Sequence, residues 1–256
     1  EAEAVEDAAA LANAYFVMAE AYGELGKEGA ELLMQRSLEA YQRSGNVEKQ
    51  VDVLSKIGTV CQWEGHWDEA LSYHKQAREA AQTVGGTVNA AISSIYIGQI
   101  LIDRGEWTEA EALLAETLPL LRASQYRYYF AHCPVQFGRV APHTRRLNEA
   151  LRRLEEAKAN YVQVGAEQDI PLVDTWIGEC RVAMGEPDAA LELVRRLLAS
   201  ADKSHGLSKV MARLSRVQGH ALLRQGDYWG ARESLEASLL SAKEHHNLFD
   251  AAITML

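Results

Sequence analysis

The feature that most constrains the fold is a sequence period of about 40 residues. The stretch EGHWDEAL at 64–71 returns as RGEWTEAE at 104–111. Two series of small residues share this period, with successive members 40 or 41 positions apart. They are Gly58, Gly98, Gly138, Gly178 and Gly219, and then Ala30, Ala70, Ala110, Ala150, Ala190 and Ala231. Such a period predicts an array of stacked units, none of which can bury its apolar face alone.

Each unit is predicted to hold two helices joined by a short turn. A glycine in the left-handed conformation can close the first helix, and a Ser, Thr, Asp or Asn side chain can cap the second. The glycines at the expected helix ends are Gly65, Gly105, Gly185 and Gly226. The N-cap candidates are Asp68, Thr108 and Asp188, each three residues after one of these glycines, and Asn148 at the same place in the fourth unit. A second series of turn glycines separates the units, at Gly45, Gly85, Gly165 and Gly206.

The two small-residue series have a packing explanation. The glycine series falls on the first helix of each unit, and the alanine series falls on the second. Where two helices cross closely, a larger side chain forces their axes apart, and overpacking of this kind costs about 1–3 kcal/mol. The small residues therefore predict one close crossing in every hairpin.

These features resemble the tetratricopeptide repeat family over essentially the whole chain. The family places a glycine early in the first helix and an alanine early in the second. Its turn motif has counterparts here in GHW at 65–67, GEW at 105–107 and GDY at 226–228. The 40-residue period departs from the basic repeat of about 34 residues. It is similar to the long-repeat subclass found in sensor arrays of bacterial signal-transduction ATPases, in maltose-regulator-like transcription activators and in cell-polarity scaffolds.

The resemblance implies an all-α tetratricopeptide-type solenoid with six helical hairpins and a final partial helix. It also implies a right-handed superhelix whose concave groove is lined by the first helices. We expect a single array over 1–256, with units of about 4–45, 46–85, 86–125, 126–165, 166–206 and 207–246, and a partial unit at 247–256. The apolar residues of this last segment lead us to expect a fragment of a longer protein, or a final helix with a packed partner.

Polar and aromatic side chains of the first helices are expected to face the groove. They differ in type from unit to unit, whereas the packing positions repeat. Such variation is typical of a binding surface, although exposed helical positions can also vary in sequence without a function. The candidate partner-binding residues are Ser55, Thr59, Gln62, Tyr96, Gln99, Asp103, His132, Gln136, Arg139, Thr175, Trp176, Glu179, Arg213, Arg216, His220 and Arg224.

The arginines of the sixth unit suggest one kind of ligand. Arg213 and Arg216 are three residues apart and share a helix face, with Arg224 two turns beyond. Such a cluster could receive an acidic peptide or a terminal carboxylate. The Lys and Asn clamp of the chaperone-tail-binding members of the family is absent. Its positions hold residues such as Tyr15, Ala19, Asp52 and Lys56, so no chaperone tail is expected.

The sequence predicts no catalytic, cofactor or metal site. Nucleotide-binding, zinc-protease and nucleophile-elbow motifs are absent. Cys61, Cys133 and Cys180 are widely spaced without a CxxC pair, which favours a reducing compartment such as the cytoplasm. His74 takes a position that is usually filled by a core residue. Trp67 and Trp107 are expected to pack at the hairpin turns, whereas Trp63 and Trp176 lie closer to the groove.

Charge and hydropathy narrow the class of partner. Residues 1–120 hold 8 Lys and Arg against 20 Asp and Glu, a net charge of −12, whereas residues 121–256 hold 18 against 16, a net charge of +2. An acidic first half disfavours nucleic acid as a partner, because its phosphates would be repelled. No apolar run reaches the ~18 residues that a membrane span requires.

Two functions remain open. The first is a non-catalytic scaffold or regulatory module that binds a peptide, a protein or a neighbouring domain in its groove. The alternative is an effector-sensing array that binds a small molecule and switches a linked ATPase, cyclase or transcription-regulator output domain. Both are binding functions, so we do not expect an enzyme.

The stretch YRYYFAHCPVQFGRVAPH at 126–143 is in register with the other units, although its composition suggests a site. Cys133 matches Val53 and is therefore expected to be buried. Pro134 is expected in the first turn of a shortened helix. Proline in a helix interior costs about 3 kcal/mol, so Pro142 predicts that the helix kinks or ends near Ala141, with Arg145 in place of the turn glycine.

Overall fold

The computed structural model describes residues 2–24, 29–140, 143, 145–199, 210–244 and 248–255. These residues form thirteen α-helices and one 3₁₀ turn, without a strand. In chain order the helices are α1 (Ala2–Glu24), α2 (Ala30–Ser44), α3 (Val47–Trp63), α4 (Trp67–Thr83), α5 (Thr87–Asp103), α6 (Trp107–Arg122), α7 (Arg127–Val140), α8 (Leu147–Gln163), α9 (Ile170–Ala183), α10 (Pro187–Ala199), α11 (Met211–Gln225), α12 (Tyr228–Glu244) and α13 (Leu248–Met255). The 3₁₀ turn η1 (Glu167–Asp169) precedes α9.

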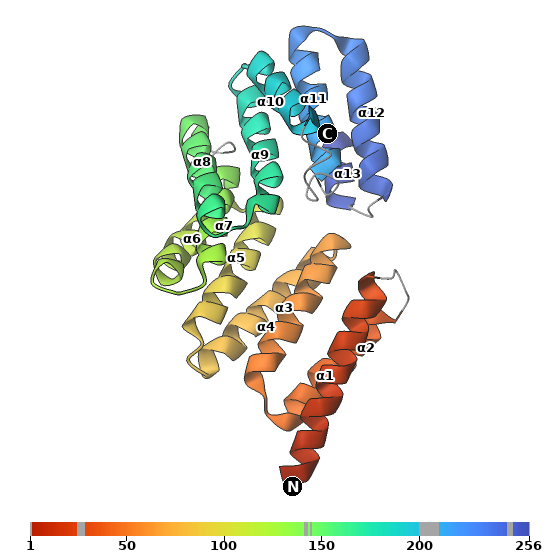
Figure 1. The fold of residues 1–256 in the computed structure, drawn as a ribbon, viewed down its shortest axis with the longest axis vertical. Coiled ribbons are helices and arrows are strands. Elements are labelled where there is room, and N and C mark those ends of the chain that lie inside the picture. Colours follow the sequence, from red (N-terminus) through yellow and green to blue (C-terminus); the bar gives the residue numbers. More distant parts are fainter. Residues whose placement is uncertain are drawn as a thin grey trace. The chain divides into compact units, whose positions relative to one another are not determined.

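The all-α fold is confirmed (Figure 1). Each of the six predicted units contains two consecutive helices, and α13 follows as the expected partial unit. We call the odd-numbered helices, which open each unit, the A helices, and their even-numbered partners the B helices. The handedness of the superhelix stays a prediction.

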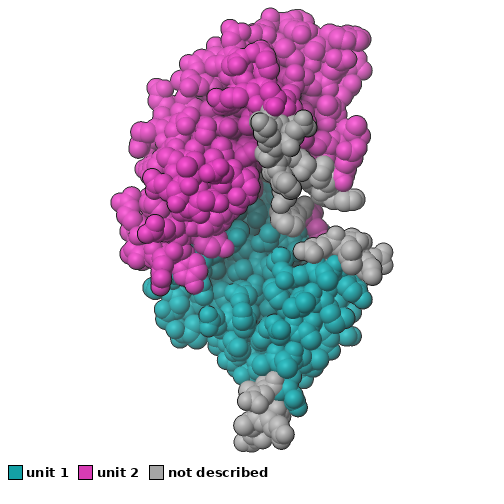
Figure 2. Space-filling view, in the orientation of Figure 1, with its two compact units in different colours: residues 1–62, 66–100 teal, residues 63–65, 101–256 magenta. Residues whose placement is uncertain are grey.

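The chain divides into two compact units, which are coloured separately in Figure 2. Unit 1 comprises residues 1–62 and 66–100, and unit 2 comprises residues 63–65 and 101–256. The core of unit 1 includes Ala12, Met34, Val53 and Ile57 from α1, α2 and α3. The largest core of unit 2 extends from Ala131 on α7 to Ala221 on α11.

The close crossings predicted from the small residues are present at Gly58, Gly138 and Gly219, whereas a methyl group added to Gly178 would lie closest to Val217 of the next A helix, at 2.7 Å. A methyl group added to Gly138 would lie 2.5 Å from Cγ of Leu154 on the paired B helix. One added to Gly58 would lie 2.8 Å from Nε2 of His74. On the B helices, Ala70, Ala110, Ala150 and Ala190 are completely buried, and Ala231 is 2% exposed. Ala30 differs, because it is the first residue of α2 and is only half-buried.

The turn glycines have the predicted left-handed conformation. Their φ angles lie between 70° and 84° at Gly45, Gly65, Gly85, Gly105, Gly165, Gly185 and Gly226. Gly206 lies outside the described residues. Arg145 has a φ of 60°, the only positive φ at a described non-glycine position. This confirms that Arg145 takes the place of the turn glycine in the fourth unit.

The predicted N-caps are wrong by two residues. The B helices begin one residue before Asp68, Thr108, Asn148 and Asp188, which are therefore second helical residues. The N-cap positions before α4, α6 and α8 are His66, Glu106 and Arg146, and none of them forms a side-chain capping bond. The turn is closed by backbone bonds instead, as in the bond from His66 N to Cys61 O at 2.8 Å.

The fourth unit contains one confirmed and one wrong prediction. Helix α7 ends at Val140, as expected from Pro142, which itself lies outside the described residues. Pro134, in contrast, lies in the middle of α7 and not in its first turn. Pro134 is buried between helical neighbours that are also buried, so tertiary packing maintains the helix despite the missing backbone donor.

Candidate binding surface

The sixteen candidate residues all lie on A helices, and we call them the A-helix row. In unit 1, Ser55, Thr59 and Gln62 on α3 and Tyr96 and Gln99 on α5 are half-buried. The remaining residues belong to unit 2, on the last turn of α5 and on α7, α9 and α11. Most of the residues in unit 2 contact one another.

Arg139 links α7 to the end of α5. Its Nη2 forms a short ion pair with Oδ1 of Asp103, and both side chains are nearly buried, at 10% and 9% exposure. Its Nη1 donates to Oε1 of Gln136 at 2.9 Å. The guanidinium is therefore fixed by partners on two helices.

These contacts determine the tautomer of His132. Because Oε1 of Gln136 accepts from Arg139, Nε2 of Gln136 is the donor to Nε2 of His132, at 2.9 Å. The proton of the neutral ring is then on Nδ1, which donates to Oη of Tyr161 at 2.5 Å. Burial, and to a smaller extent the nearby charge of Arg139, lower the pKa of His132 to about 4. His132 is thus a neutral part of a hydrogen-bonded chain.

Trp176 on α9 lies between two arginines. The guanidinium carbon of Arg139 lies 4.7 Å from the centre of a Trp176 ring, and that of Arg213 lies 4.2 Å from it. Cation–π contacts of this kind contribute up to about 2 kcal/mol each when they are desolvated. They connect α7, α9 and α11 through one side chain.

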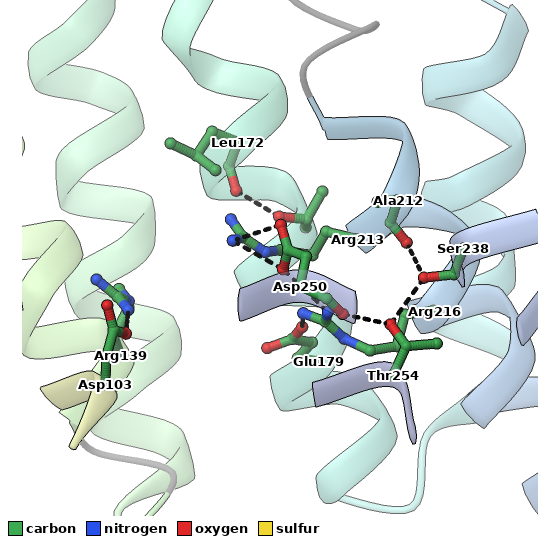
Figure 3. Close-up of polar contacts among 11 residues, drawn as sticks. Asp103, Arg139, Leu172, Glu179, Ala212, Arg213, Arg216, Ser238, Asp250 and Thr254 are labelled. Carbon is green, nitrogen blue, oxygen red and sulfur yellow. Dashed lines mark hydrogen bonds and ion pairs between the residues drawn. The ribbon is translucent and has the colours of Figure 1, made fainter. Parts of the chain in front are cut away.

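The arginines of α11 are already paired with carboxylates. Arg216 donates to Oδ1 of Asp250 at 3.0 Å and to Oε1 of Glu179 at 2.7 Å, and Arg213 reaches Asp250 at 3.2 Å (Figure 3). Arg216 is 2% exposed and Asp250 is 4% exposed. Burial would raise the pKa of Asp250, but the two guanidiniums outweigh it and hold this pKa below its usual value.

Asp250 also joins α13 to the row. Thr254, one turn further along α13, forms a hydrogen bond of 2.9 Å with Ser238 of α12, and Ser238 donates to the carbonyl of Ala212 at 2.6 Å (Figure 3). The six charged residues Asp103, Arg139, Glu179, Arg213, Arg216 and Asp250 carry three charges of each sign. The arginine cluster is therefore an internally neutralised network and not an open anion site.

Three candidates are buried and do not present their side chains to a ligand. Gln136 and Arg216 are only 1% and 2% exposed, and Thr175 is completely buried, with its hydroxyl bonded to the carbonyl of Leu172 at 2.7 Å. In contrast, Arg224 is exposed, His220 is half-buried and Glu179 is 29% exposed at its side chain. These last three remain the accessible members of the row on α9 and α11.

Sequence reasoning missed Asp250 and Tyr161. One regularity could have identified Asp250. Oppositely charged residues on successive A helices are separated by nearly the same number of positions in the sequence. Asp103 and Arg139 are 36 residues apart, and Glu179 and Arg216, like Arg213 and Asp250, are 37 apart. This is about one period less one helical turn. No comparable signal marks Tyr161, which belongs to a B helix.

The other expected core residues behave as predicted. His74 is completely buried and stacks on Tyr96, with ring centres 4.9 Å apart. Trp107 stacks on His143 at 4.6 Å. Cys133 is completely buried, and burial raises the pKa of its thiol to about 12. The side chain of Trp63 lies outside the described residues.

The described parts of the chain contain no candidate metal site and no candidate membrane span. No group of three or more His, Cys, Asp and Glu side chains could hold a metal ion there. None of the helices combines the length and the apolar character that crossing a membrane requires.

Comparison with known proteins identifies the repeat type. The sequence profile named Tetratricopeptide repeat matches residues 50–123. No curated protein sequence matches the chain.

Several solved structures share the fold at low sequence identity. A Rap protein complexed with competence and sporulation factor has a TM-score of 0.62 at 14% identity, over 94% of this chain and 71% of its own. The Rap conjugation gene regulator of plasmid pLS20, in complex with the Phr* peptide, has a TM-score of 0.63 at 14% identity, over 87% and 70%. BtubC from P. vanneervenii has a TM-score of 0.63 at 16% identity, over 84% and 90%.

Proposed function

Since this chain belongs to the tetratricopeptide repeat family, we propose that it is a non-catalytic interaction module that binds a peptide or protein segment. The partner would lie along the A-helix row and contact the accessible side chains of α9 and α11. We propose further that residues 1–256 act as one array of repeats.

The observation that carries this proposal is the fixed network beneath these accessible side chains. Glu179 is held by Arg216, and Trp176 is held between Arg139 and Arg213. Side chains that are ordered before binding lose little conformational entropy when a partner arrives. The network therefore favours a surface whose side chains are ordered before a partner binds. It fits less well with exposed positions that vary in sequence without a binding role.

Two structural relatives support the choice of partner class. These two Rap structures are complexes, one with competence and sporulation factor and the other with the Phr* peptide. Both proteins share the fold of this chain, although their low identity carries no residue-level detail. By analogy, an extended peptide is the ligand class that we favour.

The charge balance of the network refines the expected peptide. The guanidiniums of Arg213 and Arg216 already have the carboxylates of Glu179 and Asp250 as partners. An acidic peptide would have to displace a buried ion pair, which leaves a charge uncompensated and is strongly unfavourable. We therefore propose a peptide of mixed polarity, without a requirement for an acidic residue.

Selection from a random peptide library on the immobilised chain tests this function. Affinities of the selected peptides are then measured by calorimetry. We expect the double variant His220→Ala/Arg224→Ala to weaken binding by about tenfold or more. The matched control is Arg232→Ala/Glu236→Ala, which removes an exposed ion pair of α12 and should leave the affinity unchanged.

Two outcomes would contradict the proposal. One is the recovery of peptides whose affinity depends on the α12 pair and not on His220 and Arg224. The other is a failure to recover any peptide, combined with a metabolite that raises the melting temperature of the chain. The second result would favour the effector-sensing alternative.

A further inference from the structure

The start of α7 presents an aromatic ring to solvent. Tyr128 is 39% exposed, and it lies one helical turn before His132 and two turns before Gln136. Both of these residues belong to the A-helix row, so Tyr128 extends the same side of α7 by one turn. Its ring meets the edge of the Tyr129 ring at 5.4 Å between ring centres, and its centre lies 5.8 Å from that of Tyr161.

A chain of hydrogen bonds holds Tyr128 in place, although its ring is exposed. His132 donates its Nδ1 proton to the hydroxyl of Tyr161 at 2.5 Å, so the proton of Tyr161 can be donated onward to Tyr128. Tyr128 in turn donates to the carboxylate of Asp169. Burial, followed by the charge of Asp169, raises the pKa of the Tyr128 phenol, which therefore remains a neutral donor. A side chain fixed in this way is ordered before any ligand arrives.

Asp169 contributes a charge that the rest of this cluster does not balance. It stands at the N-cap position of α9, where an aspartate usually accepts a bond from the helix backbone, but it forms no side-chain capping bond. Its carboxylate accepts from Tyr128 instead. The exposed Glu167, two residues earlier, adds a second carboxylate. Within the described ranges, neither carboxylate forms an ion pair with a Lys or Arg.

The phenylalanines of α7 show what kind of group an aromatic ring on this helix can hold. The guanidinium carbon of Arg122 lies 5.7 Å from the ring centre of Phe130. That of Arg153 lies 5.1 Å from the ring centre of Phe137. Among the described residues, no Lys or Arg lies over the ring of Tyr128 in this way. Tyr128 is nevertheless far more exposed than Phe137, at 39% against 8%, and a carboxylate beside a ring adds to its attraction for a cation.

We infer that Tyr128 and Asp169 form a binding site for a cationic side chain, a Lys or Arg of the partner segment. The cation would lie against the ring of Tyr128 and pair with the carboxylate of Asp169, and Glu167 would add to the attraction. Arginine suits the site best, because a planar guanidinium can stack on a ring while its N–H groups donate to a carboxylate. The inference rests on the proposed function, since it assigns a residue type to one position of the bound segment.

A small probe, N-acetyl-arginine methylamide, tests the site without a peptide. It is titrated into the chain with isotope-labelled tyrosine rings and followed by NMR. We expect the ring signals of Tyr128 to shift in a saturable way, and added salt to weaken the binding. N-acetyl-citrulline methylamide has nearly the same shape without the charge, and it should cause no comparable shift. Equal shifts with both probes, or no shift of Tyr128 with the arginine probe, would overturn the inference.

Two variants remove the carboxylate and the ring separately. Asp169→Asn removes the charge and keeps an oxygen that can accept from Tyr128, and Tyr128→Leu removes the ring. Each should raise the dissociation constant of the arginine probe by about threefold or more, with unchanged helix content by circular dichroism. The matched control is Glu233→Gln, which removes an exposed carboxylate of α12 and should bind the probe as the unaltered chain does. Unchanged affinity in Asp169→Asn, or an equal loss in Glu233→Gln, would contradict the site.

Peptides selected on the immobilised chain separate this inference from the proposed function. Enrichment of Lys or Arg at one peptide position, lost when the selection is repeated on the Asp169→Asn chain, would support both. Peptides that depend on His220 and Arg224 but show no preference for a cationic residue would overturn the inference and leave the proposed function intact. Binding of the arginine probe at Tyr128, combined with a failure to recover any peptide, would support the site and contradict the proposed function.

Discussion

Hairpin two is formed by α3 and α4, and hairpin four is formed by α7 and α8. Their helices cross at equivalent positions, but side chains of different types fill the two crossings. In hairpin two Gly58 lies against the ring of His74, and in hairpin four Gly138 lies against Leu154. His74 and Leu154 are two periods apart, and both are completely buried. The repeat thus requires a glycine on the A helix, whereas its B-helix partner can be aliphatic or aromatic.

The difference has an energetic consequence. Leu154 has no polar group to satisfy. Neither ring nitrogen of His74 has a hydrogen-bond partner among the described residues, and a buried polar group without a partner costs about 1–3 kcal/mol. Stacking on Tyr96 at 4.9 Å compensates for part of this cost. The crossing of hairpin two therefore contains an unsatisfied polar side chain, which the crossing of hairpin four does not.

The largest effect on stability is expected when the histidine of hairpin two is introduced at the equivalent position of hairpin four. Leu154→His removes a buried aliphatic side chain and introduces two polar nitrogens into an apolar site. We expect a loss of about 3 kcal/mol in the free energy of unfolding, measured by urea denaturation at neutral pH. The control is Val162→His, an exposed position on the same helix, which should change stability little. A Leu154→His chain as stable as this control would show that imidazole is tolerated at any crossing.

The reverse exchange in hairpin two should stabilise the chain and change its response to acid. His74→Leu removes the unsatisfied nitrogens, for a gain of about 1–2 kcal/mol at pH 7.5. Burial lowers the pKa of His74 from 6.5 to about 4. The unfolded state therefore binds the proton first, so the contribution of neutral His74 is complete above pH 6.5 and is lost as the pH falls toward 4. At pH 5.5 this loss is about 1.4 kcal/mol.

The measurement is urea denaturation of the unaltered and His74→Leu chains at pH 7.5 and 5.5. The gap between them should widen at pH 5.5. His66→Leu, at the exposed turn of the same hairpin, is the control for removal of an imidazole, and its gap from the unaltered chain should stay smaller than that of His74→Leu. A constant gap between the His74→Leu and unaltered chains at both pH values would contradict the assignment of this response to His74.

The same comparison shows what the sequence could predict. The period gave the crossing glycines, the B-helix alanines and the left-handed turns, because each of these depends on backbone geometry that repeats. The burial of His74 was predicted from the resemblance to the repeat family, which usually places a packing residue at this position. The N-caps failed for a local reason. The backbone bond from His66 to Cys61 closes the turn at 2.8 Å, and the helix then begins one residue before Asp68.

The A-helix row was only partly predictable. Helical register identifies which residues share a side of a helix, but it does not distinguish a charge that faces solvent from one that faces the next A helix. Arg216 was expected to be accessible for this reason, yet it is 2% exposed between Glu179 and Asp250. Asp250 lies on the partial seventh unit, where the repeat offered few positions for comparison.

The smallest effect concerns the turns of the two hairpins. Gly65 closes α3 with a φ of 82°, and Arg145 occupies the equivalent place in hairpin four with a φ of 60°. A left-handed conformation costs an ordinary L-residue about 1–2 kcal/mol, whereas glycine adopts it freely. Glycine also gains freedom in the unfolded chain, which opposes folding by an amount of similar size. We therefore expect Arg145→Gly to stabilise the chain by less than about 1 kcal/mol, a shift of a few degrees at most in the melting temperature. The reciprocal variant Gly65→Arg should destabilise it, because the strain enters without a compensating contact. A loss of stability in Arg145→Gly would mean that the arginine side chain itself holds the turn of hairpin four.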